Sequence, residues 1–239
     1  MKHVFPSAAF LFIAFVLTAC KKDLPPLVVD DSSAYYPLAP GQYRIYDVDS
    51  VQFNDVTMTS DTFNYQIMEV VDSASTVVDG LDEPTYLYEL KIYKRASDTL
   101  PWTQTHYAQA GKSKTRAERS EGNLRFIKLV FPVALNKSWN GNTFISDSTE
   151  TIYTQDWLYT YTTVDTTFSH ANALYNRCIV VTQYNSQNLI EKDIEREIYA
   201  HGIGLVYKNA THVERQDLTN PNWIPEKGFI VTRRLREHN

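Results

Sequence analysis

The sequence lacks the patterns that mark helical and membrane-spanning proteins. No window places apolar residues at a sustained helical spacing between capping residues. Residues 112–121 contain helix-forming side chains but no apolar face, so they predict at most one helical turn. After residue 19, no apolar stretch approaches the roughly 20 residues that a transmembrane helix needs. These absences favour a strand-rich domain without a membrane-spanning helix.

Catalytic and metal-binding motifs are also missing. The histidines beyond the N-terminal segment are scattered: His106, His170, His201, His212 and His238. They form no His-Glu-x-x-His pair, and no Gly-x-Ser-x-Gly motif is present. Gly202-Ile203-Gly204 is not a phosphate loop, because Tyr207 occupies the sixth position and no helix is predicted to follow. The sequence therefore predicts no enzyme activity, no metal site and no cofactor.

Cysteine occurs only at Cys20 and Cys178. Residues 17–20 read Leu-Thr-Ala-Cys and end a short apolar run that follows the basic residue Lys2. This is the pattern of a lipoprotein signal, cut before the cysteine that receives the lipid. We predict a signal peptide over 1–19, a lipidated tether over 20–40 and a single β-rich domain over 41–239. Cys178 then has no partner for an intrachain disulfide, and its apolar neighbours predict a buried thiol.

Charge argues against nucleic acid as a partner. Residues 1–19 hold one of the 23 basic side chains and none of the 28 acids, so the remainder has a net charge of 22 − 28 = −6. A nucleic-acid-binding domain is expected to carry a basic surface instead. The predicted partners are a membrane, through the lipid, and a glycan, a lipid or an envelope protein.

Aromatic residues, threonine and valine are abundant, and apolar and polar residues alternate in many segments. Strands are predicted within 63–71, 86–92, 102–108, 124–130, 153–164, 174–184, 192–200, 204–208 and 229–235. Turn-forming pairs such as Asp79-Gly80 and Asn140-Gly141 separate some of these segments. We expect an all-β fold with a single antiparallel domain, either a curved sheet or an incomplete barrel, and few or no helices.

Two patterns within these strands are candidate sites. The first is an aromatic surface for a ligand, formed by Tyr153, Trp157, Tyr159 and Tyr161. The second is a row of acids with a spacing of two: Glu191, Asp193, Glu195 and Glu197. The aromatic row is also typical of the core side of a sheet, and the acidic row of a solvated face. On a solvated face, Glu195→Gln is expected to change stability by less than about 0.5 kcal/mol.

A third pattern concerns modification. Asp followed by Ser or Thr, and then by a small or apolar residue or Thr, occurs five times, whereas composition predicts about one occurrence. The hydroxyl residues are Ser50, Ser73, Thr99, Ser148 and Thr166. The pattern is similar to the periplasmic O-glycosylation site of Bacteroidetes, but it is also typical of turns. If glycans are attached, these hydroxyls are expected to be exposed.

Three stretches resemble uncharacterised lipoproteins of Bacteroidetes. They are residues 36–46 (Tyr-Pro-Leu-Ala-Pro-Gly-Gln-Tyr-Arg-Ile-Tyr), residues 124–133 with Ser-Trp-Asn-Gly-Asn at 138–142, and residues 197–208 (Glu-Ile-Tyr-Ala-His-Gly-Ile-Gly-Leu-Val-Tyr-Lys). The resemblance implies an envelope location and an all-β domain, without a known activity. The last stretch also looks like an element of half-barrel proteins related to the carriers LolA and LolB. Those carriers have a helical lid, which this sequence does not predict.

These observations leave three functional hypotheses. The leading one is a non-catalytic, lipid-anchored envelope module that binds a ligand or has a structural role. The second is a half-barrel carrier of lipid or acyl chains in the periplasm, and the third is a hydrolase that uses the acidic row from Glu191 to Glu197. The outer membrane is the expected location. The sequence does not decide between the periplasmic face and the cell-surface face of this membrane, because Lys22-Asp23-Leu24 matches only part of the surface-export pattern that the resemblance suggests.

The anchor is directly testable with Cys20→Ser. The hydroxyl cannot replace the thiol as the acceptor of the lipid, so the variant should lose lipidation and leave the washed membrane fraction. Metabolic labelling with a clickable fatty acid measures the change. A variant labelled as strongly as the wild type would contradict the assignment.

Overall fold

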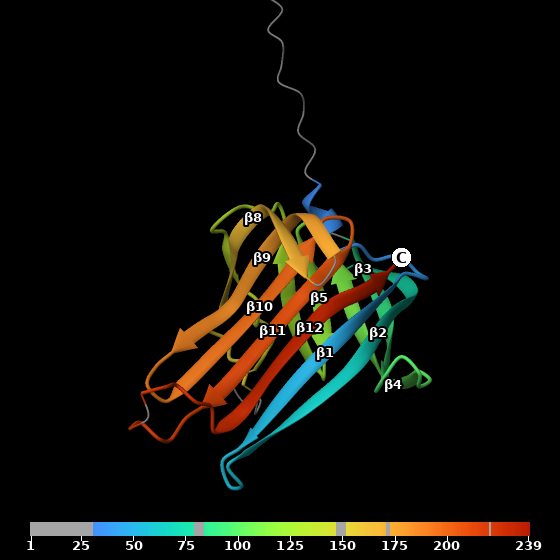
Figure 1. Ribbon diagram of the computed structural model, residues 1–239. Coiled ribbons are helices and arrows are strands. Elements are labelled where there is room, and N and C mark those ends of the chain that lie inside the picture. The colour runs from blue at the N-terminus through green and yellow to red at the C-terminus, as the bar shows by residue number, and fades with distance from the viewer. Residues whose placement is uncertain (1–30, 79–83, 147–151, 171–172, 220) are drawn as a thin grey trace, which may run out of the picture.

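The computed structural model describes residues 31–78, 84–146, 152–170, 173–219 and 221–239. These residues form one short 3-10 helix, η1 (Ser32–Tyr35), and twelve strands (Figure 1). The strands are β1 (Tyr43–Asn54), β2 (Thr59–Val78), β3 (Pro84–Arg95), β4 (Thr103–Lys112), β5 (Arg116–Glu121), β6 (Leu124–Val130), β7 (Ser138–Asn140), β8 (Leu158–His170), β9 (Ala173–Gln187), β10 (Glu191–Ala200), β11 (Gly204–Glu214) and β12 (Lys227–His238). Within this part of the chain, no helix has the length and apolar character needed to cross a membrane.

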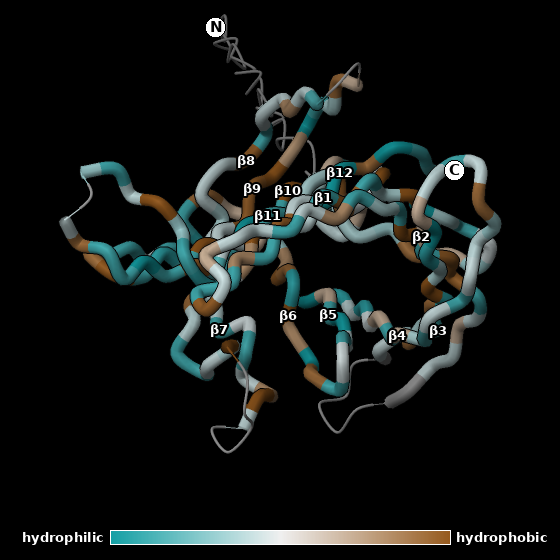
Figure 2. Tube along the Cα trace, turned by 60° about the horizontal axis from the view of Figure 1, so that its bottom comes forward, coloured by the Kyte–Doolittle hydropathy of each residue, from teal (hydrophilic) through white to brown (hydrophobic). Residues whose placement is uncertain are grey.

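All twelve strands belong to one antiparallel sheet, in the order β6-β5-β4-β3-β2-β1-β12-β11-β10-β9-β8-β7. The first and last strands are neighbours in the middle of the sheet, since β1 pairs with β12. The two edges, β6 and β7, follow one another along the chain. The sheet curls so that these edges approach, and the strand labels of Figure 2 run around a ring.

Hydrogen bonds connect the two edges. The amide of Ile127 donates to the carbonyl of Gly141 at 2.8 Å, and the indole nitrogen of Trp139 donates to the carbonyl of Ile127 at 2.8 Å. Glycine is required at position 141, because a Cβ atom there would overlap the ring of Tyr159. The sheet is thus nearly closed into a barrel, which confirms the predicted all-β fold with an incomplete barrel.

Alternation along the strands sets the inner and outer faces. In β1, Tyr46 and Val48 are buried, whereas Asp47 and Asp49 are partly exposed. Arg236 and Arg234 of β12 pair with these two acids on the outer face. The same period of two places aromatic and aliphatic side chains inside the barrel.

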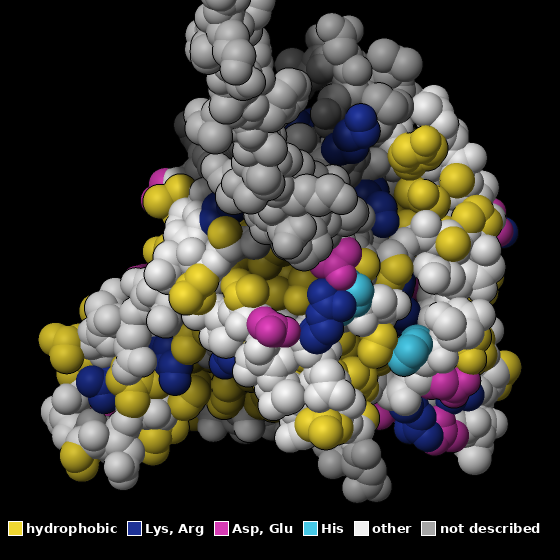
Figure 3. Space-filling model, turned by 90° about the horizontal axis from the view of Figure 1, so that it is seen from above, with side chains coloured by type: hydrophobic (Ala, Val, Ile, Leu, Met, Phe, Trp, Pro, Cys, Tyr) yellow, Lys and Arg dark blue, Asp and Glu magenta, His cyan; other side chains and the backbone are white. Residues whose placement is uncertain are grey.

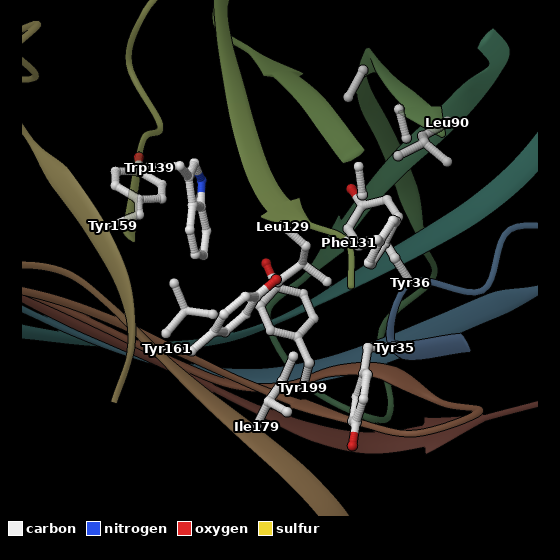
Figure 4. Close-up of a cluster of buried hydrophobic side chains, with 14 of the residues drawn as sticks. Tyr35, Tyr36, Leu90, Leu129, Phe131, Trp139, Tyr159, Tyr161, Ile179 and Tyr199 are labelled. Carbon is white, nitrogen blue, oxygen red and sulfur yellow. The ribbon is translucent and has the colours of Figure 1, made fainter. Parts of the chain in front are cut away.

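Aromatic side chains fill much of the interior (Figure 4). Trp139 and Tyr161, from the β7–β8 edge, lie with ring centroids 4.7 Å apart. Leu129 of β6 and Tyr199 of β10 lie beside them in the same cluster. The hydroxyl of Tyr161 donates to the carbonyl of Val130 at 2.8 Å, so the aromatic core also helps to join the edges.

A second apolar cluster covers part of the outer face. Phe168 and Tyr175, from the far half of the β8–β9 hairpin, pack near Tyr207 and Ile198. Shifts in register along β8 let the hairpin bend back over the sheet. Cys178 is fully buried in this cluster, as its apolar neighbours predicted.

The chain enters at the upper end of the barrel in Figure 1. The sequence placed residues up to 40 in the tether, but Ser32, Tyr35 and Tyr36 are buried. The amide of Gly202 donates to the carbonyl of Ala34 at 2.9 Å, and Arg177 pairs with Asp31 at 2.8 Å. Figure 3 views this end and shows basic, acidic and histidine side chains grouped together. The folded part therefore begins before residue 41, because aromatic side chains of the entering segment plug the barrel.

Two further expectations need correction. Residues 112–121, considered for a helical turn, form the end of β4 and the whole of β5. The two buried residues of β5, Ala117 and Glu118, are adjacent, so this strand shows no alternation that a sequence pattern could reveal. Strand β1 was not predicted, because acids and serine interrupt its apolar positions.

Candidate functional site

The acidic row does not lie on a solvated face. Glu195 and Glu197 are 0% and 2% exposed and point into the barrel, whereas Glu191 at the start of β10 is exposed. The interpretation as a solvated face is wrong for these two residues, because opposite charges from other strands meet them inside. The sequence could not reveal those partners.

Glu197 makes the most hydrogen bonds and ion pairs of these acids. Its Oε1 lies 3.0 Å from Nζ of Lys128, which reaches across the interior from β6. Its Oε2 accepts hydrogen bonds from Gln183 at 2.7 Å and from the hydroxyl of Tyr199 at 2.6 Å. Burial alone would raise the pKa of Glu197, but the charges of Lys128 and Lys208 hold it below its ordinary value. Glu197 therefore stays ionised in the interior.

Lys208 of β11 connects the two buried acids. Its Nζ lies 3.5 Å from Oε1 of Glu197 and 3.8 Å from Oε2 of Glu195. Burial disfavours its charge, but the carboxylates of Glu195, Glu121 and Glu197 raise its pKa above the ordinary value. We call Lys128, Glu195, Glu197 and Lys208 the buried ion cluster.

His212 links this cluster to the end of the barrel away from the chain entry. Strand pairing places it opposite Asp193. Its Nδ1 lies 2.9 Å from Asp193, and its Nε2 lies 3.1 Å from Oε1 of Glu195. Burial opposes the charge of the ring, but hydrogen bonds to the two carboxylates outweigh it and raise the pKa of His212.

Aromatic rings surround the imidazole. The ring of Trp157 stacks on Tyr184 at 4.4 Å with an interplanar angle of 8°, and on His212 at 6.2 Å with an angle of 11°. Phe229 lies 5.2 Å from His212. Gly228 lets β12 begin close to β11, since a Cβ there would overlap the carbonyl oxygen of His212. The rings and the buried acids together hold His212 in one position.

A pocket of about 360 Å³ opens here, and we call it the mouth pocket. Its volume lies within the range of about 300–1,000 Å³ that is usual for small-molecule sites. It is lined by Ile152, Thr154, Trp157, Tyr184, Glu191, Asp193, His212, Val213, Glu214, Gly228 and Phe229. It lies at the ends of β9–β12 that are lowest in Figure 1, opposite the chain entry.

A second cavity lies beside the buried ion cluster on its chain-entry side, where Tyr36, Pro37 and Gly204 also line it. It is lined by Glu69, Arg119, Lys128, Glu197 and Lys208 among others, and its volume is about 30 Å³. That space suits about one water molecule rather than an acyl chain. The wider mouth pocket is therefore the better candidate for a ligand.

The chemistry of the mouth favours binding over proton transfer. Both ring nitrogens of His212 are engaged with carboxylates, so no free lone pair is presented to a substrate. Glu195 is sealed from solvent. In the described part of the chain, no three His, Cys, Asp or Glu side chains are arranged to hold a metal ion.

The aromatic row predicted from the sequence divides between two places. Trp157 lines the mouth pocket, and Tyr153 donates to Glu195 at 3.3 Å. Tyr159 donates to Asn142 at 2.8 Å, and Tyr161 lies at the closing edges. Trp157, Tyr159 and Tyr161 are buried, so these residues form core and not an exposed surface.

The proposed modification sites differ in accessibility. Ser73 and Thr99 are exposed, and Thr166 is partly buried. Ser50 is buried and faces the interior beside Phe63 and Val231, so the expectation of exposure fails there. Ser148 and Cys20 lie outside the described residues.

Comparisons with known proteins give the fold two distant neighbours. No protein-family model matches the chain, and no curated protein matches it. A crystal structure of a candidate lipoprotein from Parabacteroides distasonis is similar, with 8% identity, a TM-score of 0.44, and coverage of 86% of this chain and 98% of that one. A candidate exported protein from Bacteroides fragilis, described as having a YmcC-like fold, has 13% identity, a TM-score of 0.37, and coverage of 84% and 98%.

Glu197→Gln tests the buried ion cluster. The amide cannot neutralise Lys128, and a buried charge that loses its partner costs about 3–5 kcal/mol. We expect a loss of about 3 kcal/mol in the free energy of unfolding, measured with denaturant, against less than about 0.5 kcal/mol for exposed Glu191→Gln. Equal small effects of the two substitutions would rule out the cluster.

His212 predicts a pH dependence. Because its pKa is raised on folding, its ionisation stabilises the fold fully below the ordinary value of 6.5. This contribution falls as the pH rises from 6.5 through the raised pKa. His212→Gln should flatten this decline in melting temperature, while His106→Gln, at an exposed position on β4, should preserve it. Parallel stability curves for wild type and His212→Gln above that pH would contradict the assignment.

Proposed function

We propose that the protein is a lipid-anchored, non-catalytic module of the cell envelope that binds a small ligand in the mouth pocket. The lipoprotein signal at residues 17–20 supports the anchor, and the outer membrane is its proposed location. The position of the mouth pocket is the observation on which the binding role rests. The pocket opens at the end of the barrel opposite the chain entry. A chain anchored at Cys20 would thus present the pocket away from its tether.

Rigidity supports a binding role. The mouth lies on paired strands, and its central ring is fixed by hydrogen bonds at both nitrogens. A preorganised site loses little conformational entropy when a ligand binds. The partly exposed rings of Tyr184 and Phe229 offer apolar contact area beside polar groups.

The carrier hypothesis receives less support. An acyl carrier needs a long apolar cavity, whereas the interior here is filled by aromatic side chains and the buried ion cluster. The cavity of about 30 Å³ next to that cluster leaves no room for a chain of methylene groups.

The hydrolase hypothesis also receives less support. Glu195 and Glu197, the two acids central to it, are bound to lysines, tyrosines, Gln183 and His212 inside the barrel. An acid or base must come within hydrogen-bonding distance of the reacting group. These buried carboxylates do not reach the pocket.

A fragment screen tests the binding role. The full-length chain, expressed with its own N-terminal segment and purified in detergent, is screened by ligand-observed NMR against sugars, amines and carboxylates. Bound fragments should compete with one another and remain chemically unchanged. Binding should disappear in Thr154→Trp, which fills the pocket from an exposed position, and persist in the control Thr62→Trp on β2. No binding, or binding that survives Thr154→Trp, would overturn the proposal.

A further inference from the structure

The charges of the mouth pocket are predominantly negative. Glu191, Asp193 and Glu214 line it, and no lysine or arginine is among its described lining residues. Glu191 accepts a hydrogen bond from the neutral amide of Asn188 at 3.2 Å. Lys227 lies 3.3 Å from Glu214, in a pair whose side chains are 50% and 41% exposed. Such an exposed pair is held weakly.

His212 does not reverse this balance. Its single positive charge lies between the carboxylates of Asp193 and Glu195. The Oε2 atom of Glu195 is buried without a hydrogen-bond partner, and its nearest cation is Lys208 at 3.8 Å. The buried ion cluster behind the mouth holds two lysines and two glutamates, so it adds no net positive charge to offset the acids that line the pocket.

Rings and aliphatic groups accompany these carboxylates. The ring of Trp157 is nearly parallel to the rings of both Tyr184 and His212. Tyr184 and Phe229 keep part of their surface exposed, and Ile152 is 46% exposed. Aromatic faces attract organic cations through their quadrupole, and apolar walls suit the carbon body of such a ligand.

A bare metal ion fits this arrangement less well. No cluster of metal-ligating side chains is found among the described residues. A calcium ion needs several oxygens at about 2.3–2.6 Å, whereas an organic ammonium group tolerates wider spacing and uses the rings as well. The size of the pocket, its negative charge and its aromatic rings therefore all favour an organic ammonium group over a metal ion.

We infer that the mouth pocket binds a small organic ammonium compound, with its positive charge between Glu191 and Glu214 and its carbon body against Tyr184 and Phe229. This inference rests on the proposed binding function and specifies its ligand class. Asp193 positions His212 and adds negative charge behind the ligand.

Three probes of nearly equal size test the inference: benzylammonium, benzyl alcohol and benzoate. Their binding to the full-length protein is followed by ligand-observed NMR, with Thr154→Trp as the blocked-pocket reference. Benzylammonium should bind about tenfold more tightly than benzyl alcohol, and benzoate least. Its affinity should fall as salt is added.

The double variant Glu191→Gln with Glu214→Gln removes two carboxylates that are not part of the buried ion cluster. It should weaken benzylammonium binding roughly tenfold and leave benzyl alcohol binding unchanged. The control Glu89→Gln with Glu237→Gln removes two exposed carboxylates outside the mouth and should change neither.

The outcomes separate the inference from the proposed function. Equal binding of benzylammonium and benzyl alcohol, both blocked by Thr154→Trp, would overturn the ligand class and keep the binding site. Preferred binding of benzoate would do the same. Failure of all three probes and of the fragment library would overturn both.

Discussion

The contact between Lys128 and Glu197 is the constraint on which the mouth depends. It joins β6, at one edge of the sheet, to β10 on the opposite wall. Removing two charges from water costs several kcal/mol each, and their attraction offsets this only with good geometry and further hydrogen bonds. Glu197 meets that requirement with Gln183, Tyr199 and Lys208. The barrel therefore needs its edges close together for the cluster to be satisfied.

The same constraint extends outward to the mouth pocket. Lys208 holds Glu195, Glu195 holds His212, and His212 stacks on Trp157. Each of these side chains limits the position of the next, so the packed interior also fixes the walls of the mouth pocket. Closure by Gly141 and Trp139, with the aromatic core around Tyr161, separates the cluster from bulk solvent. A site built this way suits recognition of a small ligand by shape and charge.

The sequence predicted the fold class more fully than the site. Alternation in β2, β3, β6 and β9 is local, so a period of two reveals it without tertiary information. Glu195 and Glu197 were singled out, but their burial was missed because Lys128 lies in an otherwise apolar run and approaches from a distant strand. His212 was counted among scattered histidines, since its link to Asp193 requires the β10–β11 register. One signal of the buried ion cluster was available in the sequence. The acids at a spacing of two are followed by a basic residue, Lys208, on the next predicted strand.

A double-mutant cycle of Lys128→Met and Glu197→Gln tests most directly whether the barrel is organised around this contact. Unfolding with denaturant gives the free energy of unfolding of each single variant and of the double variant. We predict a coupling energy of about 2 kcal/mol, because either single change leaves a buried charge without its partner, and the double change removes both charges. Additive losses, within about 0.5 kcal/mol, would contradict the account.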